Sequence, residues 1–87
     1  DELEECLSES SGVEEEYAAI ELSEAINAFL STLNYTDRFI FVRRYWYSDS
    51  PEEIARMADS TPNSVTVRLY RLREKLKHYL VKEGLLV

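Results

Sequence analysis

The chain has 87 residues and a formal net charge of -7, with 45% hydrophobic and 31% charged residues. A chain of this length forms one small domain with a thin core, so a second domain is excluded. With only two Gly and two Pro, its composition is typical of a helical protein and not of an all-β or disordered one.

The acidic charge is concentrated at the N-terminus. The first 24 residues hold ten acidic residues and no basic one, whereas the rest of the chain holds seven acids and ten bases. Because this segment is polar and self-repelling, we expect residues 1–20 to form an acidic flexible tail and residues 21–87 to form the domain. Such a tail is either a solvated spacer or a mimic of nucleic acid that occupies a basic channel in a partner. The only cysteine, Cys6, excludes an internal disulfide and a cysteine-cluster metal site.

The location of the protein follows from what the chain lacks. No apolar run is long enough to cross a bilayer, and the N-terminus has neither the basic nor the apolar stretch of a signal peptide. We therefore expect a cytoplasmic protein with no membrane partner. A start at Asp1 instead of Met indicates a piece of a longer protein.

Helical periodicity begins at Leu22 and predicts two helices before the middle of the chain. The first is expected over about 22–33, and the second ends at about 46, with Thr36 as its N-cap. Their apolar faces comprise Leu22, Ile26, Phe29, Leu30 and Leu33 in the first helix and Phe39, Ile40, Val42 and Tyr45 in the second.

Two further helices begin with clear capping signals. Ser50, Pro51 and Glu53 form a capping box with proline at the first helical position, which predicts a short third helix that buries Ile54 and Ala55. Its apolar side is also expected to include Met57 and Ala58. Thr61 and Pro62 repeat the same arrangement and open a fourth helix that runs to about Lys82, with Gly84 near its end.

The fourth helix is amphipathic and basic. Residues 62–82 contain six Lys or Arg and one Glu. An apolar stripe at spacings of three and four predicts that one side faces the core; it comprises Val65, Leu69, Leu72, Leu76 and Leu80. The other side is cationic and hydrogen-bonding.

A short helix, a tight turn and a longer basic helix are the parts of a helix-turn-helix motif. Such a motif places the N-terminal part of its second helix in the major groove of DNA, where all four base pairs can be distinguished. Base contacts are expected from Asn63, Thr66, Val67 and Tyr70, and phosphate contacts from Arg68, Arg71, Arg73 and Lys75. A basic helix that is simply solvated is the competing interpretation.

Nothing in the pattern indicates catalysis, a metal site or a cofactor. His78 has no second His or suitably spaced acid with which to act. The adjacent Glu52 and Glu53 are explained by the capping box.

The residues from about 20 to 86 closely resemble region 4, the C-terminal domain of bacterial RNA polymerase sigma factors, in particular the extracytoplasmic-function type. The most specific pieces are EEIA (Glu52–Ala55) and NSVTVRLYRLREKLK (Asn63–Lys77), supported by DRFIFVRRYW (Asp37–Trp46). The resemblance implies a non-enzymatic all-α domain of four helices that reads the -35 promoter element with its last helix. The acidic tail would correspond to the linker to region 2.

The resemblance also implies site residues and partners. Places where the family meets DNA match Pro62, Asn63, Thr66, Val67 and Arg71, and its recurrent basic positions match Arg68 and Arg73. The first two helices would hold the flap of the polymerase β subunit, with Phe29, Phe41, Tyr45 and Trp46 as the candidate surface. An anti-sigma factor could cover the same surface.

Three positions depart from the family pattern. Tyr35 stands where Pro is common, Asp59 where Gly is common, and Ser60 where a bulky apolar residue is common. Because Asp tolerates a left-handed backbone less well than Gly, the turn between the last two helices is expected to differ or to carry strain.

Two other function classes fit the same residues. One is a stand-alone helix-turn-helix regulator that reads a two-fold operator without polymerase. The other is a protein interaction module whose basic helix binds an acidic partner and never DNA. The domain upstream of residue 1 would discriminate the first of these from a sigma factor.

Overall fold

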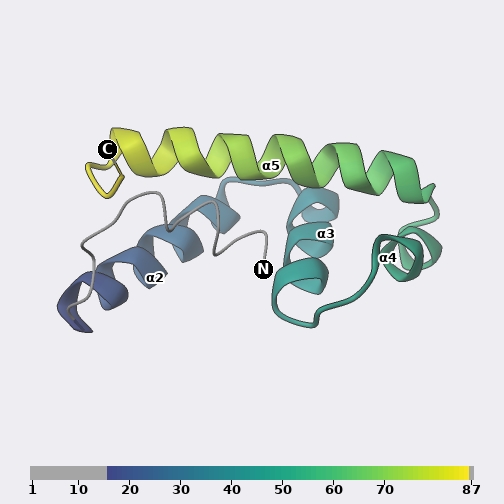
Figure 1. The fold of residues 1–87 in the computed structure, drawn as a ribbon, viewed down its shortest axis with the longest axis horizontal. Coiled ribbons are helices and arrows are strands. Elements are labelled where there is room, and N and C mark those ends of the chain that lie inside the picture. The colour runs from purple at the N-terminus through teal and green to yellow at the C-terminus, as the bar shows by residue number, and fades with distance from the viewer. Residues whose placement is uncertain (1–15, 87) are drawn as a thin grey trace. The chain divides into compact units, whose positions relative to one another are not determined.

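The computed structural model describes residues 16–86 (Figure 1). All regular secondary structure in this range is helical, which confirms the all-α prediction. The elements are α2 (Glu16–Ser31), α3 (Tyr35–Tyr45), α4 (Pro51–Met57) and α5 (Pro62–Lys82). Most of the expected acidic tail, including Cys6, lies outside the described residues.

The helices belong to two compact units. We call Leu33–Leu72 the helix-turn-helix unit, because it contains α3, α4 and the first half of α5. We call the other the terminal unit; it contains α2 and the chain from Arg73 onward. Helix α5 is continuous through both.

Helix α2 begins earlier than the sequence predicted. It starts at Glu16, whereas the charge pattern placed the end of the tail at residue 20 and the helix start at Leu22. The segment 16–21 contains neither Gly nor Pro, and its Ala and Glu residues have high helix propensity. This propensity outweighs the repulsion between neighbouring carboxylates.

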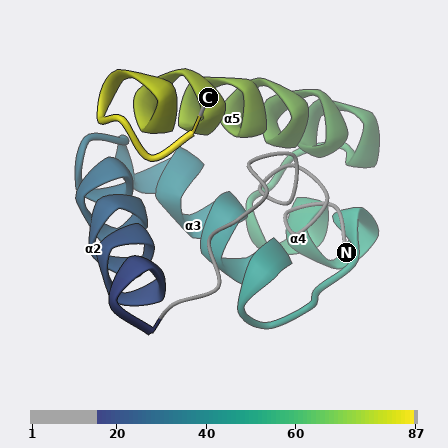
Figure 2. The same cartoon turned by 60° about the vertical axis from the view of Figure 1, so that its left-hand side comes forward.

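The terminal unit is held together by apolar packing and by an ordered helix end. The ring of Phe29 packs against that of Tyr79 with centroids 5.6 Å apart. After α5, Gly84 has a positive φ of 77°, and the N–H of Leu85 donates to the carbonyl of Leu80 at 2.9 Å. This is the Schellman arrangement, which requires a residue that tolerates a left-handed backbone. This turn is the yellow loop that follows α5 in Figure 2.

Helix α3 is capped by a different residue from the one predicted. The N-cap is Asn34, whose Oδ1 accepts a hydrogen bond from the N–H of Asp37 at 2.8 Å. Thr36, the expected cap, lies inside the first turn because the helix starts at Tyr35. Asn is as good an N-cap as Asp or Ser, so the earlier start still pairs one of the N–H groups of the first turn with a side chain.

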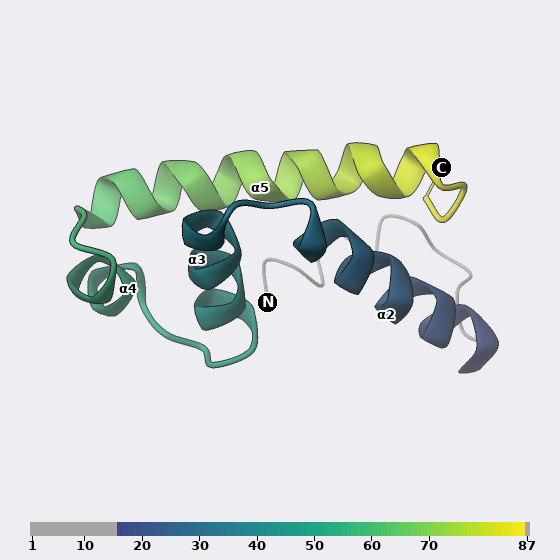
Figure 3. The same ribbon diagram turned by 180° about the vertical axis from the view of Figure 1, so that it is seen from behind.

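Helix α4 is short and has the capping box that the sequence predicted. The Ser50 hydroxyl accepts from the N–H of Glu53 at 3.2 Å, and the N–H of Ser50 donates to Oε1 of Glu53 at 2.9 Å. Pro51 occupies the first helical position. The loop that leads from α3 into this cap is visible in Figure 3.

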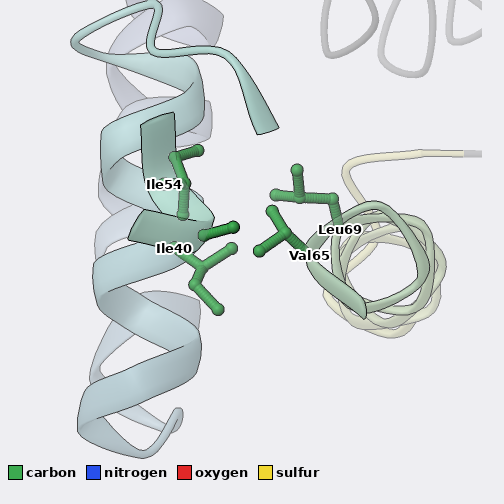
Figure 4. Close-up of a cluster of buried hydrophobic side chains, with 5 residues drawn as sticks. Ile40, Ile54, Val65 and Leu69 are labelled. Atoms are coloured by element: carbon green, nitrogen blue, oxygen red, sulfur yellow. The ribbon is translucent and has the colours of Figure 1, made fainter. Parts of the chain in front are cut away.

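The core of the helix-turn-helix unit determines which side of α5 is buried and which side is exposed. Ile40 of α3 and Ile54 of α4 point toward Val65 and Leu69 of α5, and all four are at most 2% exposed (Figure 4). Burying a side chain of this size stabilises the fold by about 1.5–3 kcal/mol. The predicted apolar stripe of α5 is buried along its whole length, which confirms that part of the sequence analysis.

Candidate nucleic-acid interface

The turn between α4 and α5 is made by a residue in left-handed conformation. Asp59 has a φ of 51°. The N–H of Ala58 donates to the carbonyl of Ile54 at 2.8 Å, and the N–H of Ser60 donates to that of Ala55 at 2.9 Å. Ser60 is exposed, so no apolar side chain plugs the turn. Backbone hydrogen bonds therefore hold a conformation that an L-residue adopts at a cost.

The predicted base-reading residues share one exposed side of α5. Burial of the opposite side leaves them open to solvent, together with several cations. The exposed residues are Pro62, Asn63, Thr66, Val67, Arg68, Tyr70, Arg71 and Lys75. Arg73, the ninth residue of the expected interface, is half-buried and makes interactions within the protein.

The first turn of α5 is arranged to accept negative charge nearby. Thr61 caps it by accepting from the N–H of Ser64 at 3.1 Å. There is no acidic residue in this turn, so no side-chain charge within the turn offsets the positive end of the helix dipole. The hydroxyl of Thr66 donates to the carbonyl of Pro62 at 2.9 Å, which leaves the hydroxyl oxygen available as an acceptor.

Arg68 is held by an acid from another helix. One of its guanidinium nitrogens lies 3.1 Å from Oδ1 of Asp37 on α3. The Arg68 side chain remains 44% exposed, so it is accessible to an anion while it is paired. This contact joins α3 to the helix that carries the candidate interface.

The loop after α3 is fixed by arginines that the sequence analysis did not single out. Nε of Arg43 donates to Oδ2 of Asp49 at 2.7 Å, and Arg44 donates to the backbone carbonyl of Asp49 at 3.1 Å. The guanidinium of Arg43 also lies 4.2 Å from the ring centre of Tyr47. A loop held at three points sets where α4 begins.

Only some of the four residues expected to bind a protein partner are accessible to solvent. Phe41 is fully buried, and it packs against Tyr45 and Trp46 with ring centroids 4.8 and 6.2 Å away. Trp46 is 53% exposed and Tyr45 is half-buried. Phe29 is buried in the terminal unit. Phe29 and Phe41 are thus core residues, because their rings are enclosed by helix packing, and Trp46 with Tyr45 forms the accessible part.

Met57 also differs from its expected position. It is 47% exposed, whereas Ile54 and Ala55 of the same helix are buried as predicted. Helix α4 ends at Met57, so its side chain lies at the rim of the core.

Ionisation is perturbed at the capping box. The pKa of Glu53 lies below its ordinary value, first because the backbone N–H of Ser50 donates to its carboxylate and second because of the Ser50 side chain. Both hydrogen bonds favour the charged form. The negative charge also stabilises the N-terminus of α4.

Within residues 16–86 there is no cluster of His, Cys, Asp and Glu that could hold a metal ion. None of the helices in this range combines the length and the apolar character needed to cross a membrane. Comparison of the chain with protein-family models, with curated proteins and with solved structures gives no match.

Proposed function

We propose that this chain recognises the -35 element of promoter DNA as the C-terminal domain of an alternative sigma factor, of the extracytoplasmic-function type, that directs RNA polymerase to promoters. One observation carries the proposal. Val65 and Leu69 are buried against α3 and α4, so the face of α5 that begins at Asn63 is turned outward beside a tight turn. The resemblance of residues 20–86 to sigma region 4 supplies the particular class.

Base recognition would come from short side chains on the exposed face of α5. The amide of Asn63 offers donors and an acceptor, and the Thr66 oxygen accepts from an amino group of adenine or cytosine. Val67 has no polar atom, so its contact is with a thymine methyl group. Tyr70 lies one turn further along the same helix.

Phosphate contacts would fix the register of the helix on the duplex. Arg71 and Lys75 are exposed one turn apart on α5, and Arg68 is accessible beside Asp37. Such contacts release counterions and make affinity fall as salt rises. They position the helix without reading sequence.

The polymerase contact would use the aromatic end of α3. Trp46 is exposed and is supported from beneath by Phe41, as expected of an anchor residue at an interface. The β-subunit flap is the partner that the family resemblance suggests, and an anti-sigma factor would compete for the same residues. This function belongs in the cytoplasm and requires no catalytic group or cofactor.

The decisive experiment is footprinting of the protein, together with core polymerase, on a promoter that was enriched from a random-sequence library. We expect protection of the -35 region only when core polymerase is present. Protection of a two-fold operator by the protein alone would instead identify a stand-alone regulator. No protection under either condition would reject DNA recognition and leave a protein interaction module.

A further inference from the structure

The helix-turn-helix unit has a cleft on α3 that the proposed DNA and polymerase contacts do not use. It has a volume of about 520 Å³ and is lined by Tyr35, Arg38, Phe39, Val42, Arg43 and Tyr47. A second cleft of about 290 Å³ shares Tyr35 and Phe39 with it and reaches Met57 at the end of α4. Together they form what we call the α3 groove.

Large apolar side chains of the α3 groove are left in water. Tyr35 is 75% exposed and Tyr47 is 60% exposed. The rings of Tyr35 and Phe39 stack with centroids 6.2 Å apart, so the exposed tyrosine is held in place by its neighbour. Contiguous exposed aromatics and methionine are typical of protein interfaces.

The spacing of these residues suits an α-helix as the occupant. Tyr35, Phe39 and Val42 repeat at intervals of four and three along α3, so they form one row about 10 Å long. Such a row of side chains packs against the apolar side of another helix.

The charge at the rim of the α3 groove indicates the sign of the charge expected on the partner. Arg43 is already neutralised by Asp49 at 2.7 Å. Arg38 is exposed, and its side chain makes no ion pair or hydrogen bond within the part of the chain that the structure describes. A carboxylate on the partner beside Arg38 would complete the interface.

Single-stranded nucleic acid fits the α3 groove less well than an acidic helix does. Binding a phosphate backbone requires several cations in a row, together with aromatic faces on which bases can stack. Here Arg38 is the one cation of the lining that makes no ion pair among the described residues, and Asp59 lines the second cleft. The face of Phe39 is already occupied by Tyr35.

We infer that the α3 groove binds an amphipathic helix of a partner protein, with apolar anchors between Tyr35 and Tyr47 and an acidic side chain against Arg38. This interaction does not depend on DNA recognition by α5. It provides a second contact through which a regulator can reach the same domain.

The test uses the intact ¹⁵N-labelled chain and a synthetic helical peptide of about 15 residues, with Leu at helical spacing and Glu on the flanks. At about 0.15 M salt, where screening reduces repulsion from the acidic residues elsewhere, the peptide should shift the amide signals of α3 between Tyr35 and Tyr47. Arg38→Glu should weaken binding at least about fivefold. Arg56→Glu reverses an exposed charge on α4 outside the groove and should leave binding unchanged.

A second test exchanges the charges on the two partners, so that the result does not depend on one particular peptide. A matched peptide with Lys in place of Glu should shift these α3 signals in the Arg38→Glu variant and not in the wild type. Equal responses of Arg38→Glu and wild type to the Glu peptide, or no shift of α3 signals, would overturn the inference. Stronger shifts of the same signals by an oligo(dT) strand than by the Glu peptide would assign the groove to nucleic acid instead.

Discussion

Asp37 and Arg68 are 31 positions apart in the sequence, and their side chains meet at 3.1 Å. The pair joins the first turn of α3 to the exposed face of α5, at the level where phosphates are proposed to bind. In the proposed complex Arg68 would therefore have two competing anionic partners, the Asp37 carboxylate and a DNA phosphate. An exposed pair of this kind is worth about 0–1 kcal/mol, so a phosphate can displace the carboxylate.

Removing the charge of Asp37 is expected to strengthen DNA binding. In Asp37→Asn, Arg68 is released and one repulsive charge near the duplex is lost, so affinity should rise about two- to fivefold. The plot of log affinity against log salt should also become steeper by up to about one unit. Fluorescence anisotropy with a labelled promoter duplex and core polymerase measures both.

Two variants separate this mechanism from a general charge effect. Glu83→Gln removes an exposed acid beyond the end of α5 and should leave affinity unchanged. In an Arg68→Ala background, Asp37→Asn should give a smaller gain than in the wild type, since the released group is then absent. Weaker binding by Asp37→Asn would contradict this account and show that Asp37 holds Arg68 in its binding position.

The capping box should make the stability of the protein depend on pH. The pKa of Glu53 is lowered in the folded protein by hydrogen bonds from Ser50, so its charged form is favoured by folding. Its contribution to the free energy of unfolding is present above the unfolded pKa of about 4.3 and is lost as pH falls through the lower folded value. The stability difference between wild type and Glu53→Gln in urea unfolding should therefore be larger at neutral pH than in acid. A difference that is constant with pH would refute this role.

The turn residue Asp59 offers a second test of stability. Its φ of 51° costs an ordinary L-residue about 1–2 kcal/mol, whereas Gly adopts it freely. We expect Asp59→Gly to be more stable than Asp59→Ala by about 1 kcal/mol, with wild type between the two or equal to Gly. Thermal unfolding of the three proteins decides the order, and an Ala variant as stable as the Gly variant would show that the turn is not strained.

Local patterns predicted most of the fold correctly. The capping box of Ser50 and Glu53, the cap at Thr61 and the buried stripe of α5 are each encoded within a few neighbouring residues, so periodicity and capping rules were enough to find them. The start of α2 was missed because charge repulsion and helix propensity favoured opposite outcomes, and propensity determined the result. Thr36 was preferred to Asn34 as a cap although both residue types cap helices well.

Long-range relationships were beyond the reach of sequence reasoning. Nothing near Arg68 indicates that Asp37 is its partner, because the contact depends on how α3 packs beside α5. For the same reason Phe29 and Phe41 were taken for surface residues, although apolar side chains of equal periodicity can face either a core or a partner. The α3 groove combines side chains from α3, the following loop and the end of α4, and no local motif marks such a surface.

The most direct measurement of the central claim is the salt dependence of promoter binding by Arg71→Ala and Lys82→Ala, each with core polymerase. Both variants lose one exposed positive charge from α5, but only Arg71 is proposed to contact a DNA phosphate. We expect Arg71→Ala to bind several-fold more weakly and to reduce the salt slope by about one unit, with Lys82→Ala unchanged. Wild-type affinity and slope in Arg71→Ala would contradict the proposal that this face of α5 binds promoter DNA.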